Sequence, residues 1–269
     1  MSFEHHAGNL RPPRIVSAET MYKAIMDVGI VPFMSNHIPG YSIEEMTAPE
    51  YWFDGDAGVL GPWDWKIDMV QSGDIVYGKF LGGKAAYATV QWYRELRAWR
   101  LGTVIPGPSS SSFSGLSRES HSSQDAAILD FINTNGAISI KEVRALLGVK
   151  KSAADAAITR LQMQCRVVTG DLIRVYRGED LHYNGWQIAS FTTPEALYGT
   201  SDFPFASSGA TASSFSGLSR KSPLSTEGTP SDSLERLLAH MEDVSGCTDR
   251  KKLLKLIFGA SCHIMLFSI

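Results

Sequence analysis

Ser139-Ile-Lys-Glu-Val-Arg-Ala-Leu-Leu-Gly148 carries the start signal, the apolar face and the stop signal of one short helix. Ser139 and Glu142 have the spacing of a capping box, in which each side chain accepts a hydrogen bond from the other residue's backbone amide. Apolar residues follow at helical spacing, and Gly148 supplies the left-handed residue that ends many helices. This stretch therefore predicts a helix of about two turns.

The segments on either side of this helix predict two more helices. Gln124 to Asn133 has helical periodicity, and Ala137-Ile-Ser139 is a short extended segment. After Gly148 we expect a third helix with Ser152 as its N-cap.

A β-wing is predicted after the third helix. Cys165 to Tyr176 has the pattern of a hairpin that turns at Thr169-Gly-Asp171, and residues 181–191 supply a further strand. Helix, short strand, helix, turn, helix and wing is the order typical of a winged helix-turn-helix.

Two stretches rich in serine divide the chain of 269 residues, and we interpret residues 106–123 and 201–231 as linkers. Both contain the octapeptide Ser-Ser-Phe-Ser-Gly-Leu-Ser-Arg, at residues 111–118 and 213–220. The repeat is either a duplicated linker or a repeated docking or phosphorylation motif.

The linkers leave three ordered parts, at residues 15–105, 124–200 and 232–258. The first has a winged-helix-like mixture of helices and strands, and the last is helical and closes at Gly259. The sequence thus predicts an α+β protein with tandem winged helix-turn-helix domains and a C-terminal helix. In residues 15–105 the sequence predicts the helices Ala18–Val28 and Gln91–Arg100. It also predicts the strands Val76–Phe80 and Ala85–Thr89 around a turn at Gly82-Gly83.

The composition is that of a globular protein, with 43% hydrophobic and 20% charged residues. Three cysteines without a Cys-x-x-Cys pair exclude a disulfide framework and a four-cysteine zinc site. The seven histidines lack metal-binding spacing, and no nucleotide-binding glycine motif occurs, so we expect no metal and no cofactor. The chain has neither a membrane span nor an apolar signal segment, which predicts an intracellular protein, cytoplasmic or associated with the nucleoid.

The net charge of −3 conceals segments of opposite sign. Residues 139–180 hold eight Lys and Arg against five Asp and Glu, residues 79–100 hold five against one, and residues 40–70 hold one against seven. Double-stranded DNA is the partner that a basic winged helix favours, although solvated faces or a protein partner remain alternatives. The candidate phosphate contacts near the third helix are Lys150, Lys151, Arg160 and Arg166.

Gly61-Pro-Trp-Asp-Trp-Lys66 places Asp64 between Trp63 and Trp65. One interpretation is an aromatic pocket that holds a carboxylate and receives a stacked base, with Asp64 as a catalytic candidate. The alternative is that the tryptophans anchor the core and Asp64 bonds local amides.

Gln162-Met-Gln164 lies where the third helix meets the wing. Two such amides can position a water molecule or bind a base edge. They can equally form the polar rim of a winged-helix core.

Several strings together carry a family resemblance, and they occur in this order: Val28-Gly-Ile-Val-Pro-Phe, Tyr41-Ser-Ile-Glu-Glu45, Tyr51-Trp-Phe, Gly61-Pro-Trp-Asp-Trp-Lys66, Tyr77-Gly-Lys-Phe80, Thr159-Arg-Leu-Gln-Met-Gln164, Tyr183-Asn-Gly-Trp186 and Thr193-Pro-Glu-Ala-Leu-Tyr-Gly199. The set resembles the AlkZ-related proteins, short relatives of the AlkZ/YcaQ winged-helix DNA glycosylases. The resemblance covers most of the chain outside the serine-rich stretches.

The resemblance implies a DNA-binding protein of tandem winged helices, with a role in the repair of alkylated bases. AlkZ-type glycosylases hydrolyse the N-glycosidic bond of alkylated purines with a Gln-x-Asp or Gln-x-Gln motif, and Gln162 and Gln164 match that motif by letters. In the glycosylases the motif lies in the first winged-helix unit, whereas here it lies in a later one. The sequence therefore leaves two functions open, a DNA glycosylase and a non-catalytic module that binds DNA or a protein.

Overall fold

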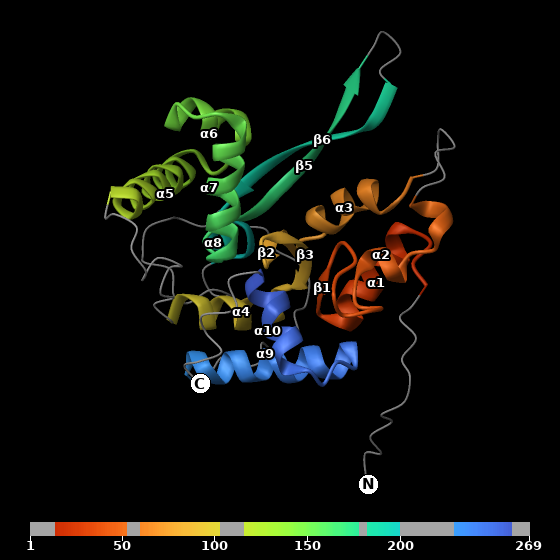
Figure 1. Ribbon diagram of the computed structural model, residues 1–269. Coiled ribbons are helices and arrows are strands. Elements are labelled where there is room, and N and C mark those ends of the chain that lie inside the picture. Colours follow the sequence, from red (N-terminus) through yellow and green to blue (C-terminus); the bar gives the residue numbers. More distant parts are fainter. Residues whose placement is uncertain (1–13, 53–59, 103–115, 178–181, 200–228, 260–269) are drawn as a thin grey trace.

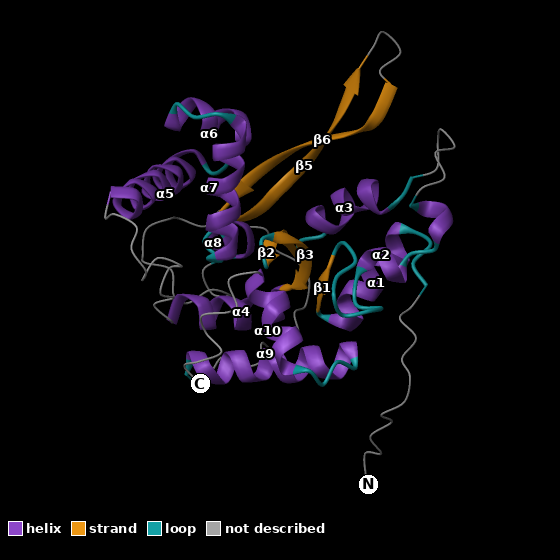
Figure 2. Ribbon diagram, in the orientation of Figure 1, coloured by secondary structure: helices purple, strands orange, loops and turns teal. Residues whose placement is uncertain are grey.

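A computed structural model describes residues 14–52, 60–102, 116–177, 182–199 and 229–259 (Figure 1). Within these ranges the chain combines helices with two antiparallel sheets of three strands each, so it is an α+β protein (Figure 2). Most of the two predicted linkers lies outside the described residues. So does the 213–220 copy of the octapeptide.

The first unit begins near the N-terminus and is built around the sheet β1-β3-β2. The last strand runs directly into α4, which lies beside the sheet. Its elements are α1 (Ala18–Val28), β1 (Ile30–Pro32), α2 (Ile43–Met46), the short 3-10 helix Pro49–Tyr51, α3 (Pro62–Gln71), β2 (Ile75–Leu81), β3 (Lys84–Thr89) and α4 (Val90–Gly102).

The second unit repeats this plan with the sheet β4-β6-β5. In both sheets the first strand pairs with the third, and two α-helices lie between the first and second strands among the described residues. Its elements are α5 (Leu116–Asn135), β4 (Ile138–Ser139), α6 (Ile140–Leu147), α7 (Lys151–Met163), β5 (Val168–Arg177), β6 (His182–Thr192) and α8 (Pro194–Tyr198).

Two further helices, α9 (Pro230–Ser245) and α10 (Arg250–Phe258), return to the first unit (Figure 1). Leu237, Met241 and Ile257 are buried in the same core as the side chains of α1 and of the sheet β1-β3-β2. Because α4 and α9 belong to one core, the second unit is an insertion between them. The predicted boundaries between 15–105, 124–200 and 232–258 stay predictions.

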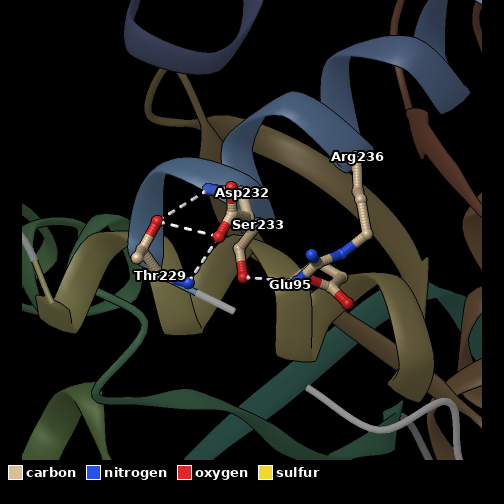
Figure 3. A network of polar contacts seen from close by, with 5 residues as sticks. All are labelled: Glu95, Thr229, Asp232, Ser233 and Arg236. Atoms are coloured by element: carbon tan, nitrogen blue, oxygen red, sulfur yellow. Dashed lines mark hydrogen bonds and ion pairs between the residues drawn. The ribbon is translucent and has the colours of Figure 1, made fainter. Parts of the chain in front are cut away.

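Polar contacts fix the start of α9 against α4 (Figure 3). Thr229 and Asp232 form a capping box, in which the Asp232 amide bonds Thr229 Oγ1 and the Thr229 amide bonds the Asp232 carboxylate. Arg236 reaches across to Glu95 of α4 at 2.8 Å and also bonds Ser233 Oγ at 3.1 Å. Since Glu95 and Ser233 are buried, these contacts satisfy polar groups that packing of α9 removes from water.

Most helix limits agree with the sequence signals, and two differ. The capping box of Ser139 and Glu142 and the left-handed Gly148 are confirmed for α6. The predicted N-cap of α7 is wrong, because Lys150 occupies that position and Ser152 lies inside the helix. Helix α5 begins at Leu116 instead of Gln124, so it includes the end of the predicted linker and of the first octapeptide.

The predicted hairpin turn at Thr169-Gly-Asp171 is also wrong. Residues 168–177 form one strand, β5, which pairs with β6 throughout, and the register shifts between Thr169 and Asp171. A Cβ at Gly170 would lie 2.8 Å from Thr192 Cγ2, so glycine is needed here for close approach of the strands. Gly170 therefore lies in a β-bulge and not in a turn. Bulges and turns both favour glycine, so the residue alone does not distinguish them.

Two buried arginines of α4 join elements that are distant in the sequence, and Arg97 joins the two units. Arg97 Nε donates to the Cys165 carbonyl at 3.1 Å, and its guanidinium forms an ion pair with Glu195 of α8. Arg100 Nη2 donates to the carbonyls of Phe80 and Ile257 at 2.7 and 3.0 Å. Cys165 has φ 55°, the one positive φ of a non-glycine residue in the described part of the chain.

Gly29 is enclosed by an aromatic stack at the end of α1. The rings of Trp92 and His240 lie parallel with centroids 3.7 Å apart, and His240 Nε2 bonds the Val28 carbonyl at 2.8 Å. Gly29 has φ 79°, and a Cβ there would lie 2.4 Å from Trp92 Cδ1. Burial lowers the pKa of His240, which favours the neutral ring in this contact.

We expect Gly29→Ala to destabilise the protein more than Gly246→Ala. Gly246 has left-handed helical backbone angles, which cost an alanine about 1–2 kcal/mol. Gly29 has φ 79° and ψ −46°, outside that region, so alanine is at least as unfavourable there. A Cβ at Gly29 would also overlap ring atoms of Trp92 and His240, and this overpacking adds about 1–3 kcal/mol. Nothing lies within 4 Å of a Cβ at Gly246. Urea unfolding followed by tryptophan fluorescence measures both losses, and equal losses would contradict the packing at Gly29.

Arg97→Met tests the contact between the units. It leaves Glu195 partly buried without its cation, and we expect a loss of about 3–5 kcal/mol in the free energy of unfolding. The matched control is Arg14→Met, which removes an exposed ion pair with Glu50 worth about 0–1 kcal/mol. Similar small losses in both variants would show that the Arg97 contact does not hold the units together.

Candidate nucleic-acid interface

The N-terminal half of α7 projects one face into solvent. Lys151, Ser152, Ala153 and Ala156 are exposed on it, and Lys150 is exposed just before it. The opposite face is buried in the core of the second unit, where it presents these side chains: Ala154, Ala157, Ile158 and Leu161. A helix with one anchored face and one exposed, small-residue face is suited to enter a DNA groove.

Helix α3 is the counterpart of α7 in the first unit, but strands β5 and β6 of the second unit pack against it. Ile67 and Val70 of α3 pack against Leu172 of β5. Gln187 of β6 donates to the Trp63 carbonyl at 2.7 Å. The exposed surface of α3 is therefore small, and α7 is the freer of the two helices.

The four predicted phosphate contacts do not form one patch. Lys150 and Lys151 are exposed at the N-terminus of α7, and the described residues give neither an ion pair. Arg160 is held inside the unit, since its Nε donates to Asp125 Oδ2 at 3.0 Å in a side-on pair with that carboxylate. Arg166 is exposed beyond the other end of α7, whose axis rises about 18 Å from Lys151 to Met163 at 1.5 Å per residue.

The two predicted tryptophans have different surroundings. Trp63 is 46% exposed, and its ring lies edge-on to Phe33 with centroids 4.7 Å apart. Lys66 Nζ lies 5.0 Å from the centroid of the Trp63 ring. Trp65 is only 6% exposed and packs on Tyr51, so in this structure it presents little surface to DNA.

Asp64 lies in the first turn of α3, where Oδ2 accepts a hydrogen bond from the Gly61 amide at 3.2 Å. Its other oxygen, Oδ1, is buried and has no hydrogen-bond partner among the described residues. Burial lowers the pKa of the neighbouring Lys66, and the charge of Asp64 acts in the opposite direction. Asp64 therefore caps its helix with Oδ2, and its Oδ1 can still accept a hydrogen bond.

Gln162 is 2% exposed and connects three elements. Its Oε1 accepts from the Lys79 amide of β2 at 3.0 Å, and its Nε2 donates to Thr169 Oγ1 at 3.3 Å. Both ends of the amide are thus occupied, which favours a structural role, and catalysis at Gln162 stays a prediction. Gln164 is the C-cap of α7 and is partly exposed.

Among the predicted site residues, Lys150 lies beside Lys151 and Trp63 beside Asp64, as their adjacent positions in the sequence require. It describes no contact that joins Asp64 to Gln162, and the acids Asp54 and Asp56 near Asp64 lie outside the described residues. Sequence reasoning missed the Asp125 partner of Arg160 and the burial of Arg97 and Arg100, because charge counts carry no information about depth.

Within the described ranges, no group of three or more His, Cys, Asp or Glu side chains is arranged to hold a metal ion. No helix among the described residues has the length and apolar character to cross a bilayer.

The molecule is thus an α+β protein in which a second unit, inserted into the first, exposes a lysine-bearing helix. Residues 15–258 match the protein family described as AlkZ related, and the chain belongs to that family. Searches of curated proteins and of solved structures gave no match.

Gln162→Leu tests the glutamine bridge between the units. The substitution removes the acceptor of the Lys79 amide, and an unsatisfied buried amide costs about 1–3 kcal/mol. Gln164→Leu is the matched control, since no hydrogen bond of the Gln164 side chain is described, and we expect little change. Urea unfolding compares the two, and a stable Gln162→Leu variant would remove the structural role and favour a functional one.

Proposed function

We propose that this AlkZ-related protein binds double-stranded DNA through the exposed N-terminal half of α7. In this proposal both units are winged helices, and the second one contacts DNA. The observation that carries the proposal is the contrast between α7, whose N-terminal half is exposed with Lys150 and Lys151, and its counterpart α3, which β5 and β6 cover.

The shared topology supports the assignment of tandem winged helices. Each unit has the order helix, strand, helix, helix, strand, strand, and each sheet pairs its first strand with its third. In a winged helix, the helix before the two long strands enters the major groove, and in the second unit that helix is α7. Family membership supports DNA as the partner, because the family is named for its relation to AlkZ, a DNA glycosylase.

The charges at α7 favour phosphate contacts. Lys150 and Lys151 flank the helix N-terminus, where the helix dipole also attracts anions. Each contact between a lysine and a phosphate releases counterions, so binding through these residues depends on salt.

DNA glycosylase activity is the second candidate function, and Asp64 favours it. A buried carboxylate oxygen that has no hydrogen-bond partner among the described residues, next to the exposed Trp63, is suited to stabilise the cationic sugar that forms when an alkylated base leaves. An alkylated purine is itself a good leaving group, so the protein needs few groups for this reaction. In this candidate function Asp64 is the catalytic residue and Trp63 stacks on a base.

Fluorescence anisotropy with plain duplex DNA across a salt series tests DNA binding. We expect Lys150→Gln/Lys151→Gln to weaken binding and to reduce the slope of log affinity against log salt by about 1.8, or 0.9 per lost contact. Lys23→Gln on α1 is the control and should leave the slope unchanged. If the wild-type protein binds no duplex at low salt, the DNA proposal is wrong and a protein partner becomes the candidate.

Release of a base from an N7-alkylated duplex tests the glycosylase candidate. We expect Asp64→Asn to abolish release while the anisotropy titration stays like that of the wild type. No release by the wild-type protein on a duplex that it binds would leave a non-catalytic DNA-binding module.

A further inference from the structure

We propose that a second surface, around the turn between β2 and β3, also contacts the DNA phosphates. We call it the turn surface and define it by four exposed cations: Lys79, Lys84, Arg166 and Lys255. The inference rests on the proposed DNA binding and adds to it a second, sequence-independent contact.

The buried Arg100 contacts residues that neighbour three of these cations in the sequence. Its guanidinium donates to the carbonyls of Phe80 and Ile257, and Nη1 lies 3.5 Å from Cys165 Sγ. Lys79 precedes Phe80, Arg166 follows Cys165, and Lys255 lies two residues before Ile257. Cations from β2, from the connection after α7 and from α10 therefore each lie within one or two residues of a position that contacts the same buried guanidinium.

The turn itself adds the fourth cation. Lys84 pairs with Leu81 across the turn, and the Gly82 amide donates to the Ile257 carbonyl at 3.0 Å. The Gly83 amide meets Met163 Sδ of α7 at 2.8 Å. Since both glycine amides are occupied within the protein, the exposed lysines and not the turn backbone are the groups that can bind phosphate.

Acidic residues are scarce in the segments that form the turn surface. Residues 156–170 and 250–258 contain no Asp or Glu, and residues 75–102 contain only Glu95. Glu95 is buried and paired with Arg236, so it adds no exposed negative charge. Within the described ranges none of the four cations has an ion pair, and the exposed face of α10 adds Lys251 and Lys252.

The position of the turn surface suits a duplex that also contacts α7. Lys151 begins α7, and Met163 at its other end touches the turn, so the two basic sites are separated by about 18 Å along the helix. That length corresponds to about five base pairs at 3.4 Å each. An extended polyanion such as duplex DNA can therefore span both surfaces, with bases contacted at α7 and backbone at the turn.

The test is the salt dependence of duplex binding by the variant Lys79→Gln/Lys84→Gln/Lys255→Gln. We expect its slope of log affinity against log salt to be smaller than that of the wild type by about 2.7, or 0.9 for each phosphate contact. The charge-preserving variant with arginine at the same three positions should keep the wild-type slope. The control Arg14→Gln/Lys23→Gln removes two cations outside the turn surface and should also keep it.

The outcomes separate this inference from the proposed function. A wild-type protein without duplex binding overturns the proposed function itself. Binding by the wild type and an unchanged slope in the triple glutamine variant overturn the turn surface and leave α7 as the contact. If thermal melting shows that the triple variant is unfolded, Lys84→Gln alone decides, with an expected slope change of about 0.9.

Discussion

Two buried guanidinium groups on α4 determine how the rest of the molecule is arranged. Burying a cation is unfavourable unless hydrogen bonds and opposite charge replace water, so the groups that bond Arg97 and Arg100 must stay in place. Those groups are the carbonyls of Phe80, Cys165 and Ile257 and the carboxylate of Glu195. The Cys165 carbonyl lies just after α7 and Glu195 lies on α8, so Arg97 sets the orientation of the second unit and hence the direction in which α7 is exposed. Arg100 joins the first sheet to α10.

Local signals predicted the local structure well. The limits of α1 and α6 follow from caps and glycines that act within one turn of helix, and these limits are confirmed. The same signals failed where one residue type serves two geometries. Gly170 is required at a bulge because the Thr192 side chain lies close, and the sequence around it does not distinguish that requirement from a hairpin turn.

The candidate site was harder to predict because it depends on pairings between distant residues. Lys150 and Lys151 were identified by charge and position beside a predicted helix, and both are exposed. Arg160 has the same charge and lies on the same helix, yet Asp125 of another helix holds it. Side-chain depth follows from tertiary packing, and neither charge segregation nor helical period encodes it.

The insertion of one unit into the other also has a consequence for synthesis of the chain. The two ends of the insertion meet in space, because a Cβ at Gly102 would lie 2.2 Å from Pro230 Cγ. Translation, however, separates them by about 130 residues, or roughly 6–26 s at the usual rate of elongation. During that time the nascent first unit lacks α9 and α10 and exposes the apolar surface that these helices later cover. The second unit is complete before them, so it is the part of the protein that can fold first on the ribosome.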